Sequence, residues 1–273
     1  GGGSGYYALH MTMNKQNGGK QIGVRVDGGQ MFVVTLPQVD PTNGEALIKT
    51  YVTDIPVAAG VHQISFTCLG DGVEFHSFTF TESSSEKFSY EQSLESAPAN
   101  GMEQRTLWRF QKQDGDEKAS LVSREGARSL VYFGGKSLVN YTVECDFRIN
   151  TDSAYTAGFI IGGNRYSDSA YVTEDYRYIQ GYYVSFTKRA AKIEKLNYTH
   201  TDSNAAAERV SLEIGAWNHV KITVQGSTLS VEIVGGGKST TLTFTDSIAF
   251  GGGRFGFYSS GASASYRNLR ITG

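Results

Sequence analysis

Proline, cysteine and tryptophan are scarce in this sequence of 273 residues, which contains 4 prolines, 2 cysteines and 2 tryptophans. All the prolines lie before residue 99, so the composition changes near that point, and this favours two domains. Cys68 and Cys145 each stand inside a strand-like segment, and no nearby histidine indicates a zinc site or a nucleophile. We expect two buried free thiols, with a disulfide between the domains as the alternative.

Long apolar runs and a strong net charge are also missing. The longest apolar runs have about the length of a strand, so no segment is a candidate transmembrane helix. The formal net charge is -2, which gives no reason to expect a nucleic acid or a membrane surface as the partner. The opening GGGSG is typical of a linker, and no signal peptide is visible in the sequence.

Glycine and tyrosine are plentiful, and nearly every periodic segment alternates with a period of two, which indicates β-strands. The segment QIGVRVDGGQMFVVTL predicts a hairpin, because Asp27 and Gly28 supply the positive φ angles of a tight turn. The segment VHQISFTCLGDGVEFHSFTF predicts a second hairpin. About a dozen further candidate strands follow, and only SNAAAERV is expected to contain a short helical turn. The sequence therefore predicts an all-β protein of two β-sandwich (jelly-roll) domains.

The domain boundaries follow from composition. The polar stretch TESSSEK has the makeup of a linker. We place a first β-sandwich domain at 1–82, the linker at 83–87 and a second β-sandwich domain at 88–273.

The second domain resembles a known family. The segments SLVNYTVECDFRIN, AGFIIGG, QGYYVSF, WNHVKITVQGSTLSVEIVGG and GGGRFGFYSSGASASYRNLRI occur in an order that resembles the concanavalin-like, laminin-G-like sandwiches appended to bacterial glycoside hydrolases. Among these, the fructan-binding modules of carbohydrate-binding family 66 are the most similar. The resemblance implies a sandwich of that type with a role in binding glycans.

The first domain resembles the C-terminal part of a carbohydrate-binding module of family 6 or 35, a galactose-binding-like sandwich. The similar segments are GYYALHMTM, IGVRVDGGQMFVVTLP and IPVAAGVHQISFTCLGDGVEFHSFTF. Such modules usually begin with further strands that include a glutamate pair for structural calcium, and the last strand carries an asparagine for sugar and an aspartate for calcium. Here Glu74 and His76 stand at those last two positions. The resemblance implies an incomplete domain. It leaves structural calcium as an open alternative, with no certain cofactor and no metal ligand assigned.

One strand of the second domain carries charged residues on a single face. In YTVECDFRIN, residues two apart share a face, so Glu144, Asp146 and Arg148 lie together, opposite the apolar positions. Paired carboxylates on a strand resemble family 16 glycosidases, but their signature needs a further glutamate as acid/base. Arg148 stands there instead and would keep the carboxylates ionised. A salt-bridged polar face, a sugar-binding face and a catalytic pair remain the three interpretations.

The segment NRYSDSAYVTEDYRYIQGYY is rich in tyrosine and forms a connection longer than hairpins need. Loops on a rigid β-scaffold are where such folds carry function. A tyrosine ring packs on the apolar face of a sugar, carboxylates accept hydrogen bonds from its hydroxyls, and arginine donates to its oxygens. The candidate ligand contacts are Arg165, Tyr166, Tyr171, Glu174, Asp175, Tyr176 and Tyr178. Two alternatives are tyrosines that merely cover a sheet edge, and a protein interface.

The two tryptophans stand in or beside strand-like segments. Trp217 opens the strand-like segment WNHVKITVQ, and we expect it to pack in the core at a sheet edge. Trp108, in LWRF, fits either a core position or an exposed platform.

The residues and resemblances predict a non-catalytic carbohydrate-binding region of a modular, extracellular bacterial glycoside hydrolase, which targets the enzyme to a glycan. No residue is assigned to catalysis. The expected partners are a polysaccharide or oligosaccharide and the catalytic domain of the same parent protein, with no nucleic acid and no membrane insertion. The expected location is secreted or at the cell surface. Two alternatives stay open: an accessory domain that stabilises a catalytic domain without binding sugar, and a glycoside hydrolase in its own right.

Overall fold

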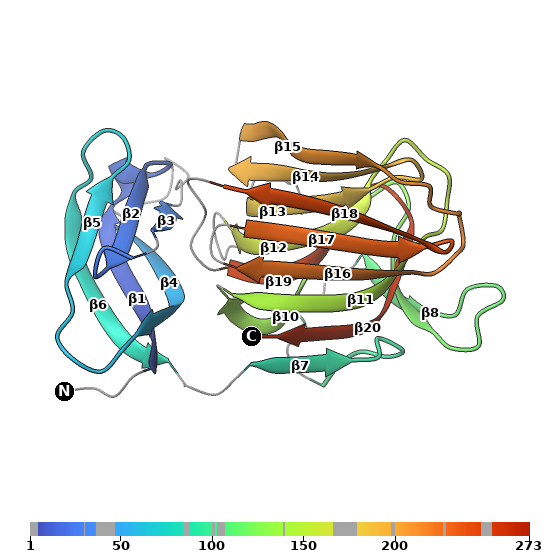
Figure 1. Ribbon diagram of the computed structural model, residues 1–273, viewed down its shortest axis with the longest axis horizontal. Coiled ribbons are helices and arrows are strands. Elements are labelled where there is room, and N and C mark those ends of the chain that lie inside the picture. Colours follow the sequence, from blue (N-terminus) through green and yellow to red (C-terminus); the bar gives the residue numbers. More distant parts are fainter. Residues whose placement is uncertain are drawn as a thin grey trace.

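The structure is a computed structural model, and it describes residues 5–29, 31–36, 47–83, 88–99, 102, 107–138, 140–165, 179–197, 200–225, 228–246 and 253–273. Two β-sandwiches lie side by side (Figure 1). We call residues 5–83 the small sandwich and residues 88–273 the large sandwich. Within the described ranges, the one helical element is the 3-10 turn Lys15–Asn17. No helix in these ranges is long and apolar enough to cross a membrane.

The small sandwich packs one three-stranded sheet on another. The two sheets have the strand orders β4-β1-β6 and β3-β2-β5. Their strands are β1 (Gly5–Asn14), β2 (Gln21–Val26), β3 (Phe32–Thr35), β4 (Leu47–Val57), β5 (Ile64–Cys68) and β6 (Phe75–Ser83). Alternate residues of the two central strands, such as Leu9 and Met11 in β1 and Ile22 and Val24 in β2, form the core between the sheets. The period-two pattern of these strands places their apolar residues there.

One of the two predicted hairpins is correct and the other is wrong. β2 and β3 pair around a turn in which Asp27 and Gly28 have φ angles of 51° and 68°. β5 and β6 are both strands, but β5 pairs with β2 while β6 pairs with β1 of the opposite sheet. Alternation identifies a strand and its faces, but the partner depends on contacts that are distant in sequence.

The large sandwich packs a six-stranded sheet on an eight-stranded sheet. The six-stranded sheet consists, in spatial order, of β10 (Arg128–Leu138), β19 (Gly253–Ser260), β12 (Ala157–Arg165), β13 (Ile179–Phe186), β14 (Ala190–Asn197) and β15 (His200–Arg209). The eight-stranded sheet consists of β18 (Lys238–Thr245), β17 (Thr228–Gly235), β16 (Asn218–Gln225), β11 (Tyr141–Ile149), β20 (Ala264–Thr272), β9 (Ser120–Ser123) and β8 (Trp108–Gln111), with β7 (Ser89–Gln92) also paired to β20. The segment SNAAAERV, expected to hold a helical turn, lies in β15.

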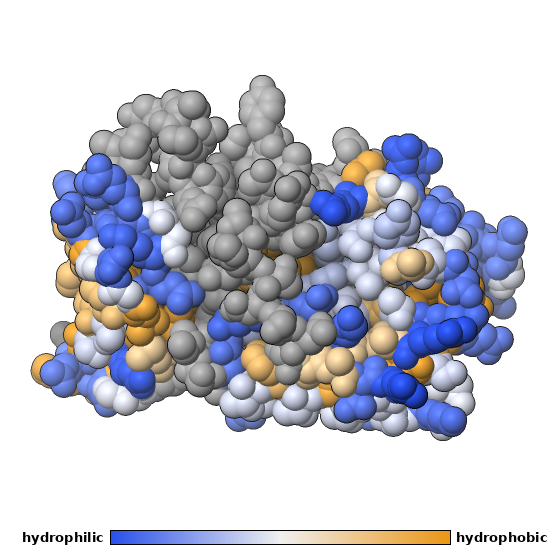
Figure 2. All heavy atoms as spheres, turned by 90° about the horizontal axis from the view of Figure 1, so that it is seen from above, coloured by the Kyte–Doolittle hydropathy of each residue, from blue (hydrophilic) through white to orange (hydrophobic). Residues whose placement is uncertain are grey.

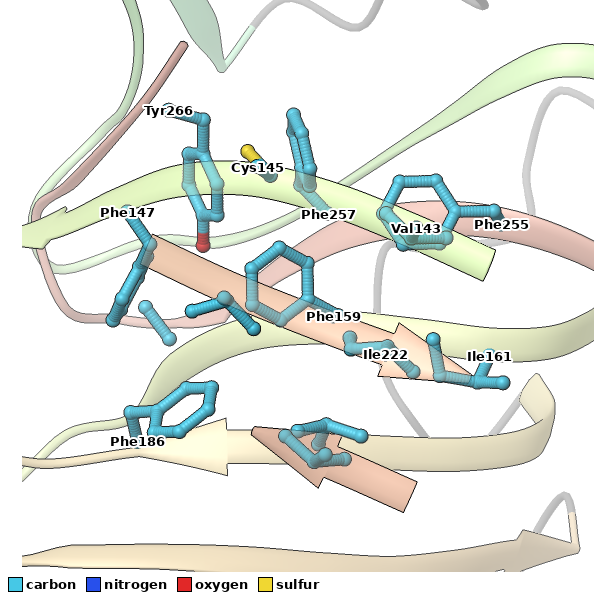
Figure 3. Packing of buried hydrophobic residues seen from close by; sticks show 14 of the residues in the cluster. Val143, Cys145, Phe147, Phe159, Ile161, Phe186, Ile222, Phe255, Phe257 and Tyr266 are labelled. Atoms are coloured by element: carbon cyan, nitrogen blue, oxygen red, sulfur yellow. The ribbon is translucent and has the colours of Figure 1, made fainter. Parts of the chain in front are cut away.

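The core of the large sandwich is aromatic (Figure 3). Val143, Cys145 and Phe147 of β11 point inward, as the alternation predicts. Across the core, Phe257 of the six-stranded sheet stacks on Tyr266 of the eight-stranded sheet, with ring centroids 4.1 Å apart. Each sheet is thereby fixed with one face inward, so the remaining residues of every strand point away from this core.

The two cysteines differ in their surroundings. Both are free, Cys145 is buried and Cys68 is exposed. The prediction of two buried thiols is therefore correct for Cys145 and wrong for Cys68. The reason is the position of Cys68 on β5, which lies at the edge of its sheet. The division of the chain at 83–87 stays a prediction, because residues 84–87 lie outside the described ranges.

Candidate functional site

The tyrosine-rich segment joins the two central strands of the six-stranded sheet. Tyr166, Tyr171, Glu174, Asp175, Tyr176 and Tyr178 lie outside the residues that the structure describes. Arg165 is the last residue of β12 and pairs through its backbone with Ile179, the first residue of β13. The predicted contacts therefore stay predictions. The two strand residues that flank their segment, Arg165 and Ile179, lie at the same end of this sheet.

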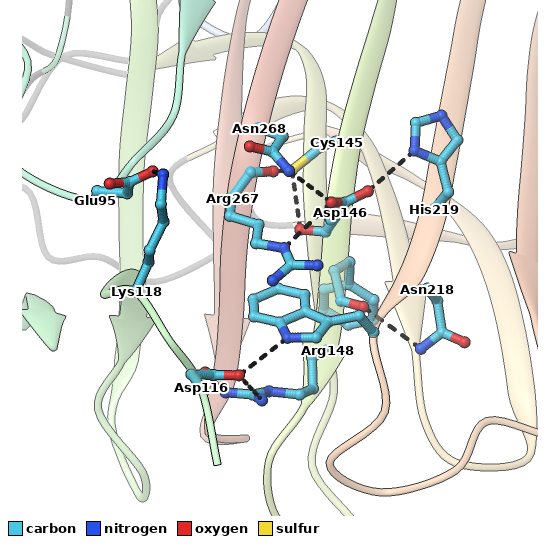
Figure 4. Close-up of polar contacts among 12 residues, drawn as sticks. Glu95, Asp116, Lys118, Cys145, Asp146, Arg148, Asn218, His219, Arg267 and Asn268 are labelled. Atoms are coloured by element: carbon cyan, nitrogen blue, oxygen red, sulfur yellow. Dashed lines mark hydrogen bonds and ion pairs between the residues drawn. The ribbon is translucent and has the colours of Figure 1, made fainter. Parts of the chain in front are cut away.

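The charged side chains on the outer face of β11 form ion pairs and hydrogen bonds with other residues of the protein (Figure 4). Asp146 accepts a 3.2 Å hydrogen bond from Arg267 and a 2.7 Å hydrogen bond from Asn268, and its other carboxylate oxygen lies 3.1 Å from His219 Nδ1. Burial opposes the ionisation of Asp146, but the hydrogen bonds from these three neighbours outweigh it and lower its pKa. Asp146 is thus held as a carboxylate by its own sheet.

Arg148 is fixed in the same way. It is only 5% exposed, and its two terminal nitrogens lie 3.0 and 2.7 Å from the two carboxylate oxygens of Asp116. Its Nε donates to Asn150 at 3.1 Å. Burial opposes the ionisation of Asp116, yet hydrogen bonds from Arg148 and Trp217, together with the charge of Arg148, lower the pKa of Asp116. Every nitrogen of this guanidinium thus has a partner within the protein.

Trp217 belongs to this network and not to the core, which corrects the expectation from sequence. The guanidinium carbons of Arg148 and Arg267 lie 4.4 and 4.0 Å from its ring centroid, and its Nε1 donates to Asp116 at 3.3 Å. Both guanidiniums contact the indole ring, and the indole is thereby held by cation–π contacts within the protein. Trp108, by contrast, is buried against Phe257 and Tyr266.

This arrangement favours the salt-bridged interpretation of the β11 face. Glu144, the remaining charged residue, is 4.0 Å from Arg270, which also pairs with Glu91 at 3.0 Å. A carboxylate that acts as an acid at neutral pH needs a raised pKa, and the pKa of Asp146 moves the other way. The predicted ligand roles of Glu144, Asp146 and Arg148 stay predictions, and their described contacts are all within the protein.

A second cluster of side chains lies on the other face of the six-stranded sheet, and all of its members are buried, at 5% exposure or less. We call it the tyrosine face, and it consists of Leu130, Tyr132, Ile160, Ile179, Tyr183, Leu196 and Tyr258, which are separate from the main core. Tyr183 and Tyr258 meet edge to face with centroids 5.0 Å apart. Four strands, β10, β19, β12 and β13, supply the three tyrosines and Ile160, so the face spans the middle of the sheet.

Glycines make room for these rings. A Cβ atom on Gly256 would lie 2.9 Å from a ring carbon of Tyr132, and one on Gly163 would lie 2.7 Å from the same ring. Tyr132 therefore rests over two bare positions of the sheet, which only glycine leaves open. On its ring lies Arg254, with the guanidinium carbon 4.5 Å from the centroid. The result is a half-buried arginine stacked on a buried tyrosine.

Polar groups border the tyrosine face. The hydroxyl of Tyr183 donates to Thr156 Oγ1 at 2.9 Å, and burial raises the pKa of Tyr183 well above its usual value, so it stays protonated. Glu194 lies directly opposite Tyr183 on β14, is half-buried, and accepts a 3.5 Å hydrogen bond from Ser185. Together with Arg254 these groups place a half-buried carboxylate and a half-buried guanidinium beside buried aromatic rings, and such charged groups bind sugar hydroxyls.

Sequence reasoning missed this face, although the signal was present. Arg254, Gly256 and Tyr258 alternate with the inward Phe255 and Phe257 in GRFGFY. Alternation therefore assigns them one outward face. That β10 and β13 contribute to the same surface follows only from the pairing of distant strands.

The described residues assemble no metal site. Among them, no group of three or more histidine, cysteine, aspartate or glutamate side chains is arranged to hold a metal ion. Glu74 and His76 stand at the positions that correspond to sugar and calcium ligands in the related modules. Both side chains are exposed, and they are not part of a metal-binding group among the described residues. These residues do not fit a calcium site.

Comparisons with known proteins agree with the sandwich architecture. One similar solved structure is a protein of unknown function with a galectin-like fold from Bacillus subtilis, with a TM-score of 0.50, 16% identity, and 67% of this chain and 94% of that chain covered. Another is winged bean acidic lectin in complex with methyl-α-D-galactose, with a TM-score of 0.51, 11% identity, and 68% and 98% covered. The carbohydrate-binding module CBM66 from Bacillus subtilis aligns with a TM-score of 0.47 and 16% identity over 64% and 92% of the chains. At such identities the likeness shows the fold.

The sequence comparisons give the family. No curated protein matches the chain. The sequence model of one family, described as the 3-keto-alpha-glucoside-1,2-lyase-like domain, matches residues 96–272. The concanavalin-like sandwich that the resemblance implies is confirmed as a fold by the galectin-like protein and the winged bean lectin. Because the family match covers more than half of the chain, the protein belongs to the family of 3-keto-alpha-glucoside-1,2-lyase-like domains.

Proposed function

We propose that this protein binds a carbohydrate at the tyrosine face of its large sandwich. The observation that carries the proposal is the presence of two half-buried charged side chains, Arg254 and Glu194, beside the buried tyrosines of this sheet. A guanidinium and a carboxylate bind sugar hydroxyls, and the tyrosine rings, which are at most 5% exposed, support these two side chains from within. The lectin-type fold and the family description, which names a glucoside, support the same ligand class.

The tyrosine face is favoured over the β11 face for two reasons. On β11, Asp146 and Arg148 already use their hydrogen-bonding groups within the protein. On the six-stranded sheet, β12 and β13 carry the two ends of the tyrosine-rich segment, and Arg254 and Glu194 lie on the neighbouring strands β19 and β14. Loops on a rigid β-scaffold are where such folds carry function, so the second location fits better.

The biological role that we propose is targeting. The protein would be a non-catalytic region of a secreted or cell-surface bacterial enzyme that degrades polysaccharides, and it would keep the catalytic domain of the same parent protein near its substrate. A few stacked rings and hydrogen bonds give modest affinity, since displaced water and lost freedom offset much of the gain. Tethering to the catalytic domain raises the effective concentration and makes modest affinity sufficient.

The test is glycan binding by matched variants. The full chain is screened on a panel of glycans, and the affinity for the best ligand is measured by calorimetry. We expect Arg254→Ala and Glu194→Gln to weaken binding about 10-fold or more, because each removes a charge-assisted hydrogen bond. Glu144→Gln, the matched change on the opposite sheet, should leave affinity unchanged. Melting curves of each variant show that the fold is retained.

Each outcome has a defined meaning. Loss of binding with Glu144→Gln but not with Glu194→Gln would move the site to β11 and overturn the proposed location. A blank glycan panel, combined with a catalytic domain that is less stable without this region, would replace the proposal with the bracing role.

A specific pair of residues favours a second candidate function, cleavage of a 3-keto-glucoside. A ketone at C3 acidifies the C2 proton, so a base can remove it while the C1–O bond breaks and the leaving oxygen takes a proton. Glu194, a carboxylate, lies directly opposite Tyr183, a phenol that stays protonated. Glu194 can serve as the base, with water protonating the leaving oxygen, and the family description names this reaction class.

Turnover distinguishes the two candidates. A 3-keto-glucoside with a chromogenic leaving group is incubated with the chain, with Glu194→Gln and with Glu144→Gln. Release that Glu194→Gln abolishes and Glu144→Gln leaves intact supports elimination. Binding without release by the wild-type chain supports the targeting role alone.

A further inference from the structure

One aromatic ring of the large sandwich is open to solvent. The rings of the tyrosine face are buried, so none of them offers a platform to a sugar. Among the described residues of the large sandwich, Tyr155 is the one exposed aromatic side chain, at 57%. It stands in the connection between β11 and β12, at the end of this sandwich that points away from the small one (Figure 1). A tyrosine ring with a free face can pack on the C–H face of a sugar.

Gly261 supports the Tyr155 ring from one side. A Cβ atom on Gly261 would lie 3.0 to 3.3 Å from three carbons of this ring, closer than side chains normally approach. Gly261 also has a φ angle of 120°, in the region that favours glycine. One side of the ring therefore rests on bare backbone, and its exposed area is left for a ligand. A ring that is already held in place loses less conformational freedom on binding.

Hydroxyl groups connect this ring to the tyrosine face. Thr156, the next residue, accepts the 2.9 Å hydrogen bond from Tyr183, and its Oγ1 lies 2.9 Å from Ser260 Oγ. Thr156 and Ser260 are half-buried, as Glu194 is. Glu194 in turn lies directly opposite Tyr183. Tyr155 therefore stands at the border of the surface on which Glu194 lies.

The ring and the two charged groups are spread out along the strands. Through the strand pairing, Glu194 is level with position 160 of β12, and Arg254 is level with position 163. Tyr155 comes just before the first residue of this strand, Ala157. From the ring to the level of Arg254 the chain advances by roughly 20 Å at the rise of a strand. A single sugar ring is much shorter and cannot contact all three groups.

We propose that Tyr155 is the stacking platform of the glycan site, and that the ligand is a linear oligosaccharide or polysaccharide and not a single sugar. One ring of the ligand packs on Tyr155, while rings further along the same chain reach Glu194 and Arg254. This inference rests on the proposed binding at the tyrosine face and extends that site to the connection between β11 and β12.

The surroundings of Tyr155 favour a sugar over a protein as the ligand. Hydrophilic residues predominate at this end of the large sandwich, at the right of the view in Figure 2. In the same connection, Asp152 pairs with Lys188 at 2.8 Å, and both side chains are exposed. The centre of a protein interface is depleted in charged residues. A single ring among hydroxyls and charges matches the mixed surface of a sugar instead.

The test compares glycans of increasing chain length. The affinities of the full chain for the best ligand of the glycan panel and for its shorter fragments are measured by calorimetry. We expect Tyr155→Ala to weaken binding of the longest glycan about 10-fold, and to leave unchanged the shortest fragment whose binding depends on Glu194, because only a long chain reaches the ring. Tyr155→Phe keeps the ring and should retain most of the affinity.

The matched control is Val234→Ala, at a residue of the eight-stranded sheet that is 40% exposed. It removes exposed apolar area elsewhere and should leave the affinity for every glycan unchanged. Both substituted residues are exposed, so we expect the variants to fold, and melting curves verify this.

The outcomes separate this inference from the proposed function. If Glu194→Gln and Arg254→Ala weaken binding while Tyr155→Ala does not, the site stands and the extension to Tyr155 is wrong. An equal loss with Tyr155→Ala for short and long glycans would overturn the extended ligand. If binding is absent, or does not depend on Glu194 and Arg254, the proposed function and this inference are both overturned.

Discussion

Arg148 and Asp116 form a bidentate ion pair at the eight-stranded sheet, with nitrogen–oxygen distances of 3.0 and 2.7 Å. Asp116 lies in the connection between β8 and β9, and Arg148 lies in β11. The pair therefore ties this connection to the sheet, and Trp217 reinforces it from a third segment.

Removing Arg148 should destabilise the large sandwich. Arg148→Met leaves the Asp116 carboxylate buried without its partner, which costs about 3 kcal/mol of unfolding free energy. Urea unfolding followed by tryptophan emission measures the loss. The matched control is Lys118→Met, which breaks the exposed pair with Glu95 and should leave the unfolding midpoint unchanged. Adding Asp116→Asn to Arg148→Met should recover part of the stability; no recovery would show that the arginine acts mainly through packing.

The stability of the small sandwich should fall as the pH rises through the titration of His62. His62 Nδ1 lies 2.6 Å from Asp27, and that hydrogen bond, followed by the one to the Ala58 carbonyl, raises its pKa above 6.5. A raised pKa means that the folded state binds the proton more tightly. The stabilisation is therefore complete below the ordinary histidine pKa, down to the acid range in which Asp27 protonates, and is lost above the raised value.

The measurement compares wild type with His62→Gln. The difference in hydrogen-exchange protection of β5 should be largest at about pH 6 and vanish at about pH 9. A difference that grows with pH would contradict the assignment, and so would a His62 that titrates below 6.5 by NMR.

Gly256→Ala should disturb both stability and binding. The added Cβ would lie 2.7 Å from the Val131 carbonyl oxygen and 2.9 Å from the Tyr132 ring, so the backbone and the ring must shift. Such overpacking costs about 1–3 kcal/mol, and displacement of Tyr132 should weaken glycan binding. Gly70→Ala is the control, since nothing lies within 4 Å of its added Cβ. Calorimetric melting and titration give both readouts, and unchanged affinity with lower stability would exclude Tyr132 from the site.

Cys145 should be unreactive until the protein unfolds. Burial raises its pKa well above the usual value, and its sulfur lies 3.3 Å from the carbonyl oxygens of both Asp146 and Arg267, either of which can accept its one proton. The thiolate is the reactive species, so a thiol reagent has no target in the folded state. In a Cys68→Ser background, labelling at about pH 8 should follow global unfolding in urea. Rapid labelling without denaturant would refute the burial of this residue.

The sequence predicts correctly which face of a strand a residue lies on, because that depends on one strand alone. Alternation assigns Val143, Cys145 and Phe147 to the core, and these residues are buried. It also places Glu144 and Asp146 on the opposite face, where the structure has them. These assignments need only the period of a strand, which is local.

Where the answer depends on strand partners, the sequence falls short. The tyrosine face joins Tyr132 and Tyr258 from strands more than a hundred residues apart in sequence. The indole of Trp217 contacts two arginines, Arg148 of β11 and Arg267 of β20, and the sequence alone does not show that they meet. The expected turn in SNAAAERV is a strand because pairing with β14 outweighs a weak helical preference.

The placement of Trp108 and Trp217 has a spectroscopic consequence. Both indoles belong to the large sandwich, and the sequence contains no others. Their emission therefore reports on one half of the molecule and is silent about the other. A melting curve recorded by fluorescence alone would show a single transition even if the small sandwich had come apart earlier.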